Sequence, residues 1–426
     1  MNVQTVMKET ELILSVSGRI DSSNAAEFEK TVQEEIQANA PQKITVDLKS
    51  LEYVSSAGLR VFLKTKKQIA DLEVINCSPD VYEIFKVTGF DQILNIHKAL
   101  RKVSLKGCEF VSRGGCGIVF RLQKDEIIKV FIDRTSEAEI QVTLDRAKAA
   151  FLAGIPTPIS YDVVQVTDYS EAIQRSIELS GKSIHSLELP EEGSGTVLGV
   201  IYEMMNNDTL AAAVMKHPEN FDMYMQQFSD LLKILHGSTA DDASVKPAKE
   251  IYQERLTQLA PYVTEEELLN LRNFVSAIPD SGRYVHNDPH LKNIMVSGGD
   301  LMFIDLDDIS KGHPVFDFLA LYNDLISAAS MEERQPGFYL QTMGITTETG
   351  KKAWQRLLEF YFNTEDPAEI EKINQSLQPY VALRTTSMMG RESMPEQIRK
   401  SALDIMRKSF FPALPMITGK LYWTLG

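Results

Sequence analysis

Cysteine is scarce in this chain, because only three of its 426 residues are cysteines: Cys77, Cys108 and Cys116. They are widely spaced and form neither a metal-binding nor a redox pair motif, which excludes a disulfide framework. We therefore expect a reducing, cytoplasmic setting. Long apolar runs are also missing and no signal peptide is recognisable, so we expect no membrane-crossing segment.

Positive charge is the second shortage. Lysine and arginine together number 44 against 59 acidic residues, which gives a formal net charge of −15. This balance offers no general electrostatic support for binding to nucleic acid or to an anionic membrane, so we expect neither as a partner. The length exceeds that of one ordinary domain, and we expect a two-domain protein.

The strongest chemical signal lies between His286 and Asp307. Asp288 is followed five residues later by Asn293, and Asp305 comes twelve residues after that. The gap between them fits a loop, a short strand, a Gly-Gly turn and a second short strand. This layout predicts that the three side chains meet in one cleft at the ends of the strands.

Phosphoryl transfer explains these residue types. The reaction needs a hydroxyl aimed in line and a metal that neutralises phosphate charge. Asp288 is suited to accept the hydroxyl proton, and Asn293 and Asp305 supply oxygen ligands for Mg²⁺. Asp307 is a candidate ligand of a second metal ion. The alternative is a zinc site of a hydrolase, but such sites need further ligands and the chain holds only seven histidines.

A nucleotide-binding lobe is predicted upstream. Gly114, Gly115 and Gly117 stand in a predicted β-hairpin, where glycine lets backbone N–H groups approach phosphates closely. The next predicted strand carries a single lysine, Lys129, placed to contact the α- and β-phosphates of ATP. The glycines alone are equally compatible with a simple tight turn. ATP and Mg²⁺ are thus the expected cofactors.

The partner of Lys129 and the adenine-binding hinge are harder to place. Glu139, near the start of the next predicted helix, is the first candidate partner, although it also fits a capping box with Ser136. Glu137 and Asp145 are the other candidates. The last strand of the lobe is predicted to lead into a hinge at Glu203–Met205, whose backbone would hydrogen-bond adenine.

The first hundred residues have a periodicity of their own. Strand-like alternation and helical spacing follow each other, which predicts an α/β domain with a mostly parallel sheet and packed helices. We predict the following organisation: this domain at 1–100, a linker at 101–107, the nucleotide-binding lobe at 108–205 with a polar surface insertion at 167–195, and a mostly helical lobe at 206–426.

Two family resemblances accompany these motifs. The pattern from His286 to Asn293, then Ile304 to Asp307 and the helix start at 313–318, resembles the aminoglycoside phosphotransferase-like branch of the protein-kinase-like superfamily. The resemblance implies an α+β bilobal fold, with Asp317 as a structural brace. Leu235-His236 looks like the element that precedes the substrate loop in this family, and we expect a structural role for His236.

Residues 1–100 resemble the STAS domain of anti-sigma-factor antagonists. The resemblance rests on short motifs at 18–21, 47–48, 58–59 and 88–90. It implies an anti-sigma protein as a partner and makes Ser56 a candidate regulatory phosphosite at a helix N-terminus. The family's Asp-Ser-Ser-Gly turn reads Ser55-Ser56-Ala57-Gly58 here, so a role of both serines in capping the helix is an equal alternative.

Three functions remain open. The first is an ATP- and Mg²⁺-dependent kinase of a small-molecule hydroxyl, regulated by or coupled to the STAS domain. The second is a protein kinase that phosphorylates Ser56 in its own or another STAS domain. His290 argues against this, because protein serine/threonine kinases usually have lysine at that position, although Lys292 offers a partial substitute. The third is a non-enzymatic anti-sigma-factor antagonist with a nucleotide-binding scaffold.

Overall fold

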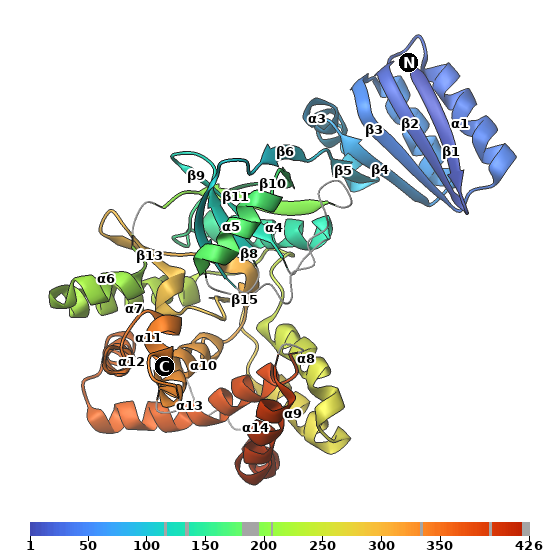
Figure 1. The fold of residues 1–426 in the computed structure, drawn as a ribbon. Coiled ribbons are helices and arrows are strands. Elements are labelled where there is room, and N and C mark those ends of the chain that lie inside the picture. Colours follow the sequence, from blue (N-terminus) through green and yellow to red (C-terminus); the bar gives the residue numbers. More distant parts are fainter. Residues whose placement is uncertain are drawn as a thin grey trace. The chain divides into compact units, whose positions relative to one another are not determined.

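The computed structural model describes residues 1–114, 117–132, 136–180, 196–205, 208–332, 335–391 and 394–419. They form two compact units, Met1–Val103 and Ser104–Gly426 (Figure 1). Gly115 of the predicted phosphate-binding hairpin lies outside the described residues. Within the described ranges, no helix combines the length and apolarity needed to cross a membrane.

The first unit is a five-stranded sheet with helices, as the sequence predicts. The strands stand in the order β1-β2-β3-β4-β5, and all neighbours are parallel except the β1–β2 hairpin. The elements are β1 (Asn2–Lys8), β2 (Glu11–Ile20), α1 (Ala25–Asn39), β3 (Lys43–Val54), α2 (Ser56–Gln68), β4 (Asp71–Cys77), α3 (Pro79–Val87) and β5 (Asn95–Lys98).

Alternating side chains and aromatic rings build the core of this unit. Leu12 and Leu14 of β2 are fully buried on one face of the sheet. On the helices, the ring of Phe62 lies 5.7 Å from that of Phe28 and 5.4 Å from that of Phe85. Such tilted and edge-to-face pairs stabilise more than burial alone. The sheet and its helices therefore share one continuous core.

A six-stranded sheet follows in the order β6-β10-β11-β9-β8-β7, and its neighbours from β10 to β7 are antiparallel. Helix α4 (Glu137–Leu152) packs beside β10 and β11. The strands are β6 (Arg101–Ser104), β7 (Glu109–Arg113), β8 (Gly117–Arg121), β9 (Glu126–Phe131), β10 (Ser160–Thr167) and β11 (Val197–Glu203).

One prediction for this region needs correction, and another gains detail. The segment 101–107, predicted as a linker, contains the boundary between the two units and also the strand β6. The segment 167–195, predicted as a polar surface excursion, begins with the helix α5 (Ser170–Ser180), which packs against β7. Tyr169, Ala172, Ile173 and Ser176 are buried there, because their helical spacing brings them onto one face. Residues 181–195 lie outside the described residues.

The remainder of the second unit is mostly helical around a large apolar core. Two short antiparallel pairs carry the loops of the site: β12 (Tyr284–Val285) with β15 (Ser310–Lys311), and β13 (Ile294–Ser297) with β14 (Asp300–Phe303). The helices are α6 (Leu210–Lys216), α7 (Phe221–Gly237), α8 (Ala248–Leu259), α9 (Glu265–Ala277), α10 (Val315–Tyr322), α11 (Phe338–Met343), α12 (Thr347–Phe362), α13 (Pro367–Met388), α14 (Glu396–Ser409) and α15 (Leu414–Ile417). A π-helical turn, η6 (Asn323–Ser327), follows α10.

Gly58 gives a test of the packing in the first unit. A Cβ atom at this position of α2 would lie 2.6 Å from a methyl group of Ile20 and 2.8 Å from one of Val54. We expect Gly58→Ala to destabilise the unit by about 1–3 kcal/mol, although alanine favours an isolated helix by about 1 kcal/mol. Urea denaturation followed by hydrogen exchange of peptides from 12–77 measures this. Arg60→Ala, on the exposed face of α2, is the control, and equal stability of the two variants would contradict the prediction.

Candidate active site

The loop that carries Asp288 is held by one buried carboxylate. Asp317 of α10 accepts hydrogen bonds from the backbone nitrogens of His286, at 3.0 Å, and Asn287, at 2.6 Å. Asn287 adopts a left-handed backbone conformation with φ 66°, which asparagine tolerates better than most residues. The predicted role of Asp317 as a brace is therefore confirmed.

The brace extends to a histidine and a tyrosine. His236 Nε2 lies 2.9 Å from Asp317 Oδ2, and His236 Nδ1 lies 2.8 Å from Tyr361 Oη. His236 and Asp317 are buried and Tyr361 is half-buried, and desolvation raises the pKa of Tyr361, so the phenol keeps its proton. His236 thus has the structural role expected of it. Tyr361, from α12, gave no signal in the sequence.

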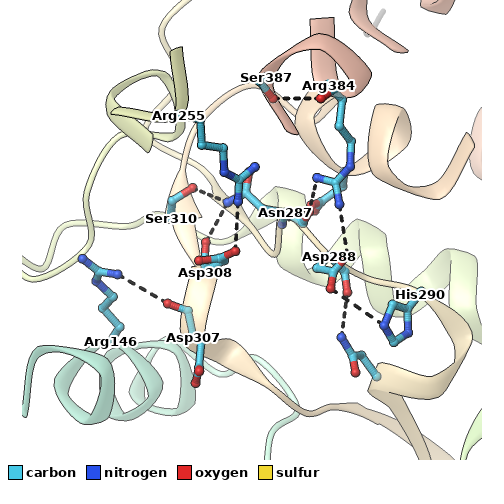
Figure 2. A network of polar contacts seen from close by, with 12 residues as sticks. Arg146, Arg255, Asn287, Asp288, His290, Asp307, Asp308, Ser310, Arg384 and Ser387 are labelled. Atoms are coloured by element: carbon cyan, nitrogen blue, oxygen red, sulfur yellow. Dashed lines mark hydrogen bonds and ion pairs between the residues drawn. The ribbon is translucent and has the colours of Figure 1, made fainter. Parts of the chain in front are cut away.

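Asp288 itself is partly exposed, with 39% of its side chain accessible. Arg384 of α13 donates to Asp288 Oδ1 at 3.1 Å, while His290 Nε2 lies 3.8 Å from Oδ2 (Figure 2). Burial lowers the pKa of His290, so its imidazole is neutral at neutral pH. Arg384 is therefore the cation that acts on Asp288 from this side. Sequence reasoning missed Arg384, because it lies 96 residues after Asp288 in the chain.

The loop that carries the predicted metal ligands is tied to the loop of Asp288. His286 Nε2 lies 3.1 Å from the carbonyl oxygen of Ile304, whose own N–H donates to the Asn293 carbonyl at 2.8 Å. The Asn293 side-chain nitrogen donates to the Asp288 carbonyl at 3.0 Å. These bonds bring Asn293 and Asp305 next to the Asp288 loop, as the spacing predicts.

Lys129 reaches this loop from the sheet of the second unit. Its ammonium group lies 2.5 Å from Asp305 Oδ1 and 2.9 Å from Asp307 Oδ2. Burial alone would lower the pKa of Lys129, but the carboxylates of Asp307 and Asp305 outweigh it and raise the pKa. The ammonium group of Lys129 is consequently charged at neutral pH, and Lys129 in turn lowers the pKa of Asp305 against the effect of burial.

Gly117 makes room for Lys129. A Cβ atom at Gly117 would lie 2.7 Å from the carbonyl oxygen of Val130 and 3.1 Å from Lys129 Cγ. The Gly114 N–H donates to the Gly117 carbonyl at 2.9 Å and closes the hairpin. The lack of a side chain at Gly117 is therefore required first by the backbone of β9 at Val130 and then by the stem of Lys129.

Glu139 does not pair with Lys129, which corrects the sequence-based prediction. It lies in the first turn of α4 with an exposed side chain, whereas Asp305 and Asp307 take the position of partner. The capping-box alternative is not formed either, because the Ser136 side chain makes no cap hydrogen bond. The sequence places these groups far apart, so only the fold could show which carboxylates meet the lysine.

The predicted hinge is pinned by its own backbone. The N–H of Glu203 donates to the Ile159 carbonyl and that of Met204 to the Asp125 carbonyl, each at 2.9 Å. The Glu203 carboxylate accepts from the Ile159 N–H at 3.1 Å. Met205 N–H has no hydrogen-bond partner among the residues that the structure describes. Of the three backbone N–H groups of the predicted hinge, those of Glu203 and Met204 are thus engaged by other segments within the described residues.

The oxygen donors of the site fit a hard cation. Asn293, Asp305 and Asp307 offer one amide and two carboxylate groups, the ligand types that Mg²⁺ prefers. The carboxylates of Asp305 and Asp307 already converge on one positive charge, that of Lys129. In the described part of the chain, no group of three or more His, Cys, Asp and Glu side chains is placed to hold a metal. The zinc-hydrolase alternative thus finds no ligand set there.

In the first unit, the two serines at the start of α2 have separate roles. Ser55 is the N-cap, and its hydroxyl accepts from the Gly58 N–H at 3.3 Å. Ser56 is the first residue of the helix and is exposed. Capping therefore accounts for Ser55 and leaves the Ser56 hydroxyl accessible.

Comparison with known proteins assigns both units. The STAS domain model matches residues 2–103, and the model of the phosphotransferase enzyme family matches residues 179–356. A candidate anti-sigma factor antagonist of Bordetella bronchiseptica is 34% identical over 89 residues, which span 20% of this chain and 76% of that protein. The anti-sigma-B factor antagonist of Bacillus subtilis is 29% identical over 100 residues, or 22% of this chain and 90% of that protein.

Solved structures resemble the second unit. The ADP-bound aminoglycoside phosphotransferase APH(2'')-Ib is 15% identical, covers 78% of this chain and 98% of its own, and gives a TM-score of 0.44. The amicoumacin kinase hAmiN, in complex with AMP-PNP, Ca²⁺ and Ami, is 15% identical. It covers 77% of this chain and 93% of its own, and gives a TM-score of 0.45. By the sequence matches, the chain belongs to the STAS domain family through residues 2–103, which are similar to anti-sigma factor antagonists, and its residues 179–356 carry a domain that matches the phosphotransferase enzyme family.

Proposed function

We propose that the second unit transfers the γ-phosphoryl group of ATP to a hydroxyl of a small molecule, with Mg²⁺ as cofactor. The observation that carries this proposal is the contact of Lys129, from the sheet, with Asp305 and Asp307, from the loop that is bonded to the loop of Asp288. A phosphate-binding lysine, oxygen ligands for a hard cation and a partly exposed base thus share one region of the unit.

Each residue has a role in this proposal. Asp288 accepts the proton of the attacking hydroxyl and aims its oxygen, and its partial exposure leaves it open to a substrate. Lys129 binds the α- and β-phosphates, while Met205 donates its backbone N–H to adenine. Asn293, Asp305 and Asp307 hold Mg²⁺, which neutralises phosphate charge when it is bound. Gly114, Gly115 and Gly117 allow the backbone to approach the phosphates.

The STAS domain is proposed to regulate this activity or to couple it to a protein partner. The supporting observation is the exposed hydroxyl of Ser56 at the N-terminus of α2. A phosphate there would be stabilised by the free N–H groups and the positive end of the helix dipole. Phosphorylation at Ser56 would therefore change the charge of this surface without removing the helix cap at Ser55.

Asp288→Asn tests the role of the base. We expect kcat to fall by at least about 100-fold, because an amide cannot accept the hydroxyl proton, while the KM for ATP changes little. The measurement is transfer of labelled γ-phosphate from Mg-ATP to a panel of small hydroxyl compounds. Asp300→Asn, at an exposed position of β14, is the matched control. Full turnover by the Asp288→Asn variant would overturn the assignment.

The exposure of Ser56 keeps a second function open, in which the kinase acts on its own STAS domain or on another. Incubation with Mg-ATP, followed by intact mass and peptide mapping, distinguishes the two. For a small-molecule kinase we expect no phosphate on the protein and unchanged turnover for Ser56→Ala. A phosphate on Ser56 that is absent from both the Ser56→Ala and the Asp288→Asn variants would favour the protein-kinase function instead.

A further inference from the structure

The metal-ligand turn, residues 305–308, is bonded at both ends to the loop that precedes the proposed base. Just before the turn, the carbonyl oxygen of Ile304 lies 3.1 Å from His286 Nε2. At the end of the turn, the carbonyl oxygen of Asp308 accepts a hydrogen bond from Asn287 Nδ2 at 2.7 Å (Figure 2). The two residues before the proposed base therefore bracket the turn that carries two of the proposed metal ligands.

The side chain of Asn287 is fixed by its two donors. It is 1% exposed, and its amide nitrogen donates to the Asp308 carbonyl and, also at 2.7 Å, to Ser310 Oγ. Both N–H groups of the amide are thus engaged. The amide oxygen has no hydrogen-bond partner among the described residues, which is costly for a buried acceptor. The reversed orientation would place this oxygen against the Asp308 carbonyl, so only the observed one links the loop to the turn.

The backbone of Asn287 carries the constraint to Asp288. The Asn287 N–H donates to Asp317 Oδ1 at 2.6 Å, and the Asn287 carbonyl accepts from Arg384 Nη1 at 2.9 Å. A second guanidinium nitrogen of Arg384 donates to Asp288 Oδ1 at 3.1 Å. The side chain, the N–H and the carbonyl of Asn287 are all bonded, so a displacement of its side chain is passed on to the next residue.

Arg255 of α8 holds the turn from another segment. Its Nη2 atom lies 3.0 Å from Asp308 Oδ2, and only 15% of the arginine side chain is exposed. The guanidinium carbon also lies 5.3 Å from the centre of the Tyr252 ring, a distance typical of a cation–π contact. Asp308 thus accepts from Arg255 through its carboxylate and from Asn287 through its carbonyl. Both contacts fix the residue that follows the proposed ligand Asp307.

We propose that Asn287 is a positioning residue that couples the base Asp288 to the metal-ligand turn, with Arg255 as the anchor of that turn. The inference rests on the proposed function, in which Asp288 is the base and Asp305 and Asp307 hold Mg²⁺. Asn287 itself touches neither the substrate nor the metal ion. Its effect is that the turn that holds the metal also sets the direction of the base, so a displacement of one displaces the other.

The first test compares Asn287→Gly with Ser310→Ala in the full chain. Glycine accepts the left-handed backbone of Asn287, with φ 66°, but removes the bond to the turn. With the acceptor that the panel identifies, we expect Asn287→Gly to lower kcat by about tenfold or more and to raise the Mg²⁺ concentration for half-maximal rate by about tenfold. Ser310→Ala removes the other bond of the amide nitrogen, leaves the bond to Asp308, and should retain both wild-type values.

Asn287→Asp checks the direction of the effect. It keeps the size of the side chain but places an acceptor opposite the Asp308 carbonyl, so its loss of kcat should be at least as large as that of Asn287→Gly. Wild-type kcat and Mg²⁺ requirement in Asn287→Gly would overturn the inference, and so would an equal loss in Ser310→Ala.

The second test needs neither an acceptor nor a metal. Urea denaturation compares the effect of Asn287→Gly in the wild type and in Arg255→Met. Because both residues hold Asp308, Asn287→Gly should lower the urea midpoint less in Arg255→Met than in the wild type. Arg399→Met is the matched control, because Arg399 is buried and donates to backbone carbonyls between 389 and 394, and there the two shifts should add. Additive shifts with Arg255→Met as well would overturn the inference.

The tests also distinguish this inference from the proposed function. If the wild type transfers phosphate to no compound of the panel, the proposed function fails, and the denaturation cycle still decides whether Asn287 and Arg255 act on the same turn. If transfer occurs and Asn287→Gly keeps the kcat and the Mg²⁺ requirement of the wild type, the proposed function stands and the inference fails.

Discussion

The Asp288 loop depends on the buried carboxylate of Asp317. A carboxyl group in the interior is costly unless hydrogen-bond donors surround it. Here the donors are two backbone N–H groups of the loop and the ring of His236. The same bonds that stabilise Asp317 also impose the left-handed turn at Asn287, and Asp288 is the next residue. The direction of the proposed base is thus set by a contact that the base does not make.

Three basic side chains of the second unit likewise fix loop residues against elements that are distant in the sequence. Lys129 meets Asp305 and Asp307, Arg255 of α8 meets Asp308 at 3.0 Å, and Arg384 of α13 meets Asp288. Desolvation of the charges offsets much of the attraction in such pairs, so their contribution to net stability is small. Their effect is geometric, because each one fixes a loop residue against an element from a distant part of the sequence. Substitution of one partner would leave the other charge uncompensated and would move the loop.

The sequence predicted what depends on local pattern. Alternation and helical spacing predicted the α/β class of the first unit, and the family resemblance implied the bilobal fold of the second. The spacing of Asp288, Asn293 and Asp305 predicted a common loop region that the structure forms. The sequence could not give contacts between distant elements, because no local pattern encodes them. Arg384 and Tyr361 were missed for this reason. The partners of Lys129 were missed likewise, because the lysine contacts Asp305 and Asp307 and not Glu139. Helix α5 was missed for another reason, since its few apolar residues are diluted among polar ones on the exposed face.

The start of α2 shows how a regulatory role can be separated from a structural one. An N-cap side chain contributes about 1 kcal/mol to helix stability, and in this chain Ser55 provides it. The neighbouring Ser56 is exposed and makes no cap bond, so a change of charge there acts through the helix dipole and the surface, and α2 keeps its cap. A functional effect of substitution at Ser56 therefore reports on partner binding or regulation, whereas the same effect at Ser55 would be mixed with loss of the cap.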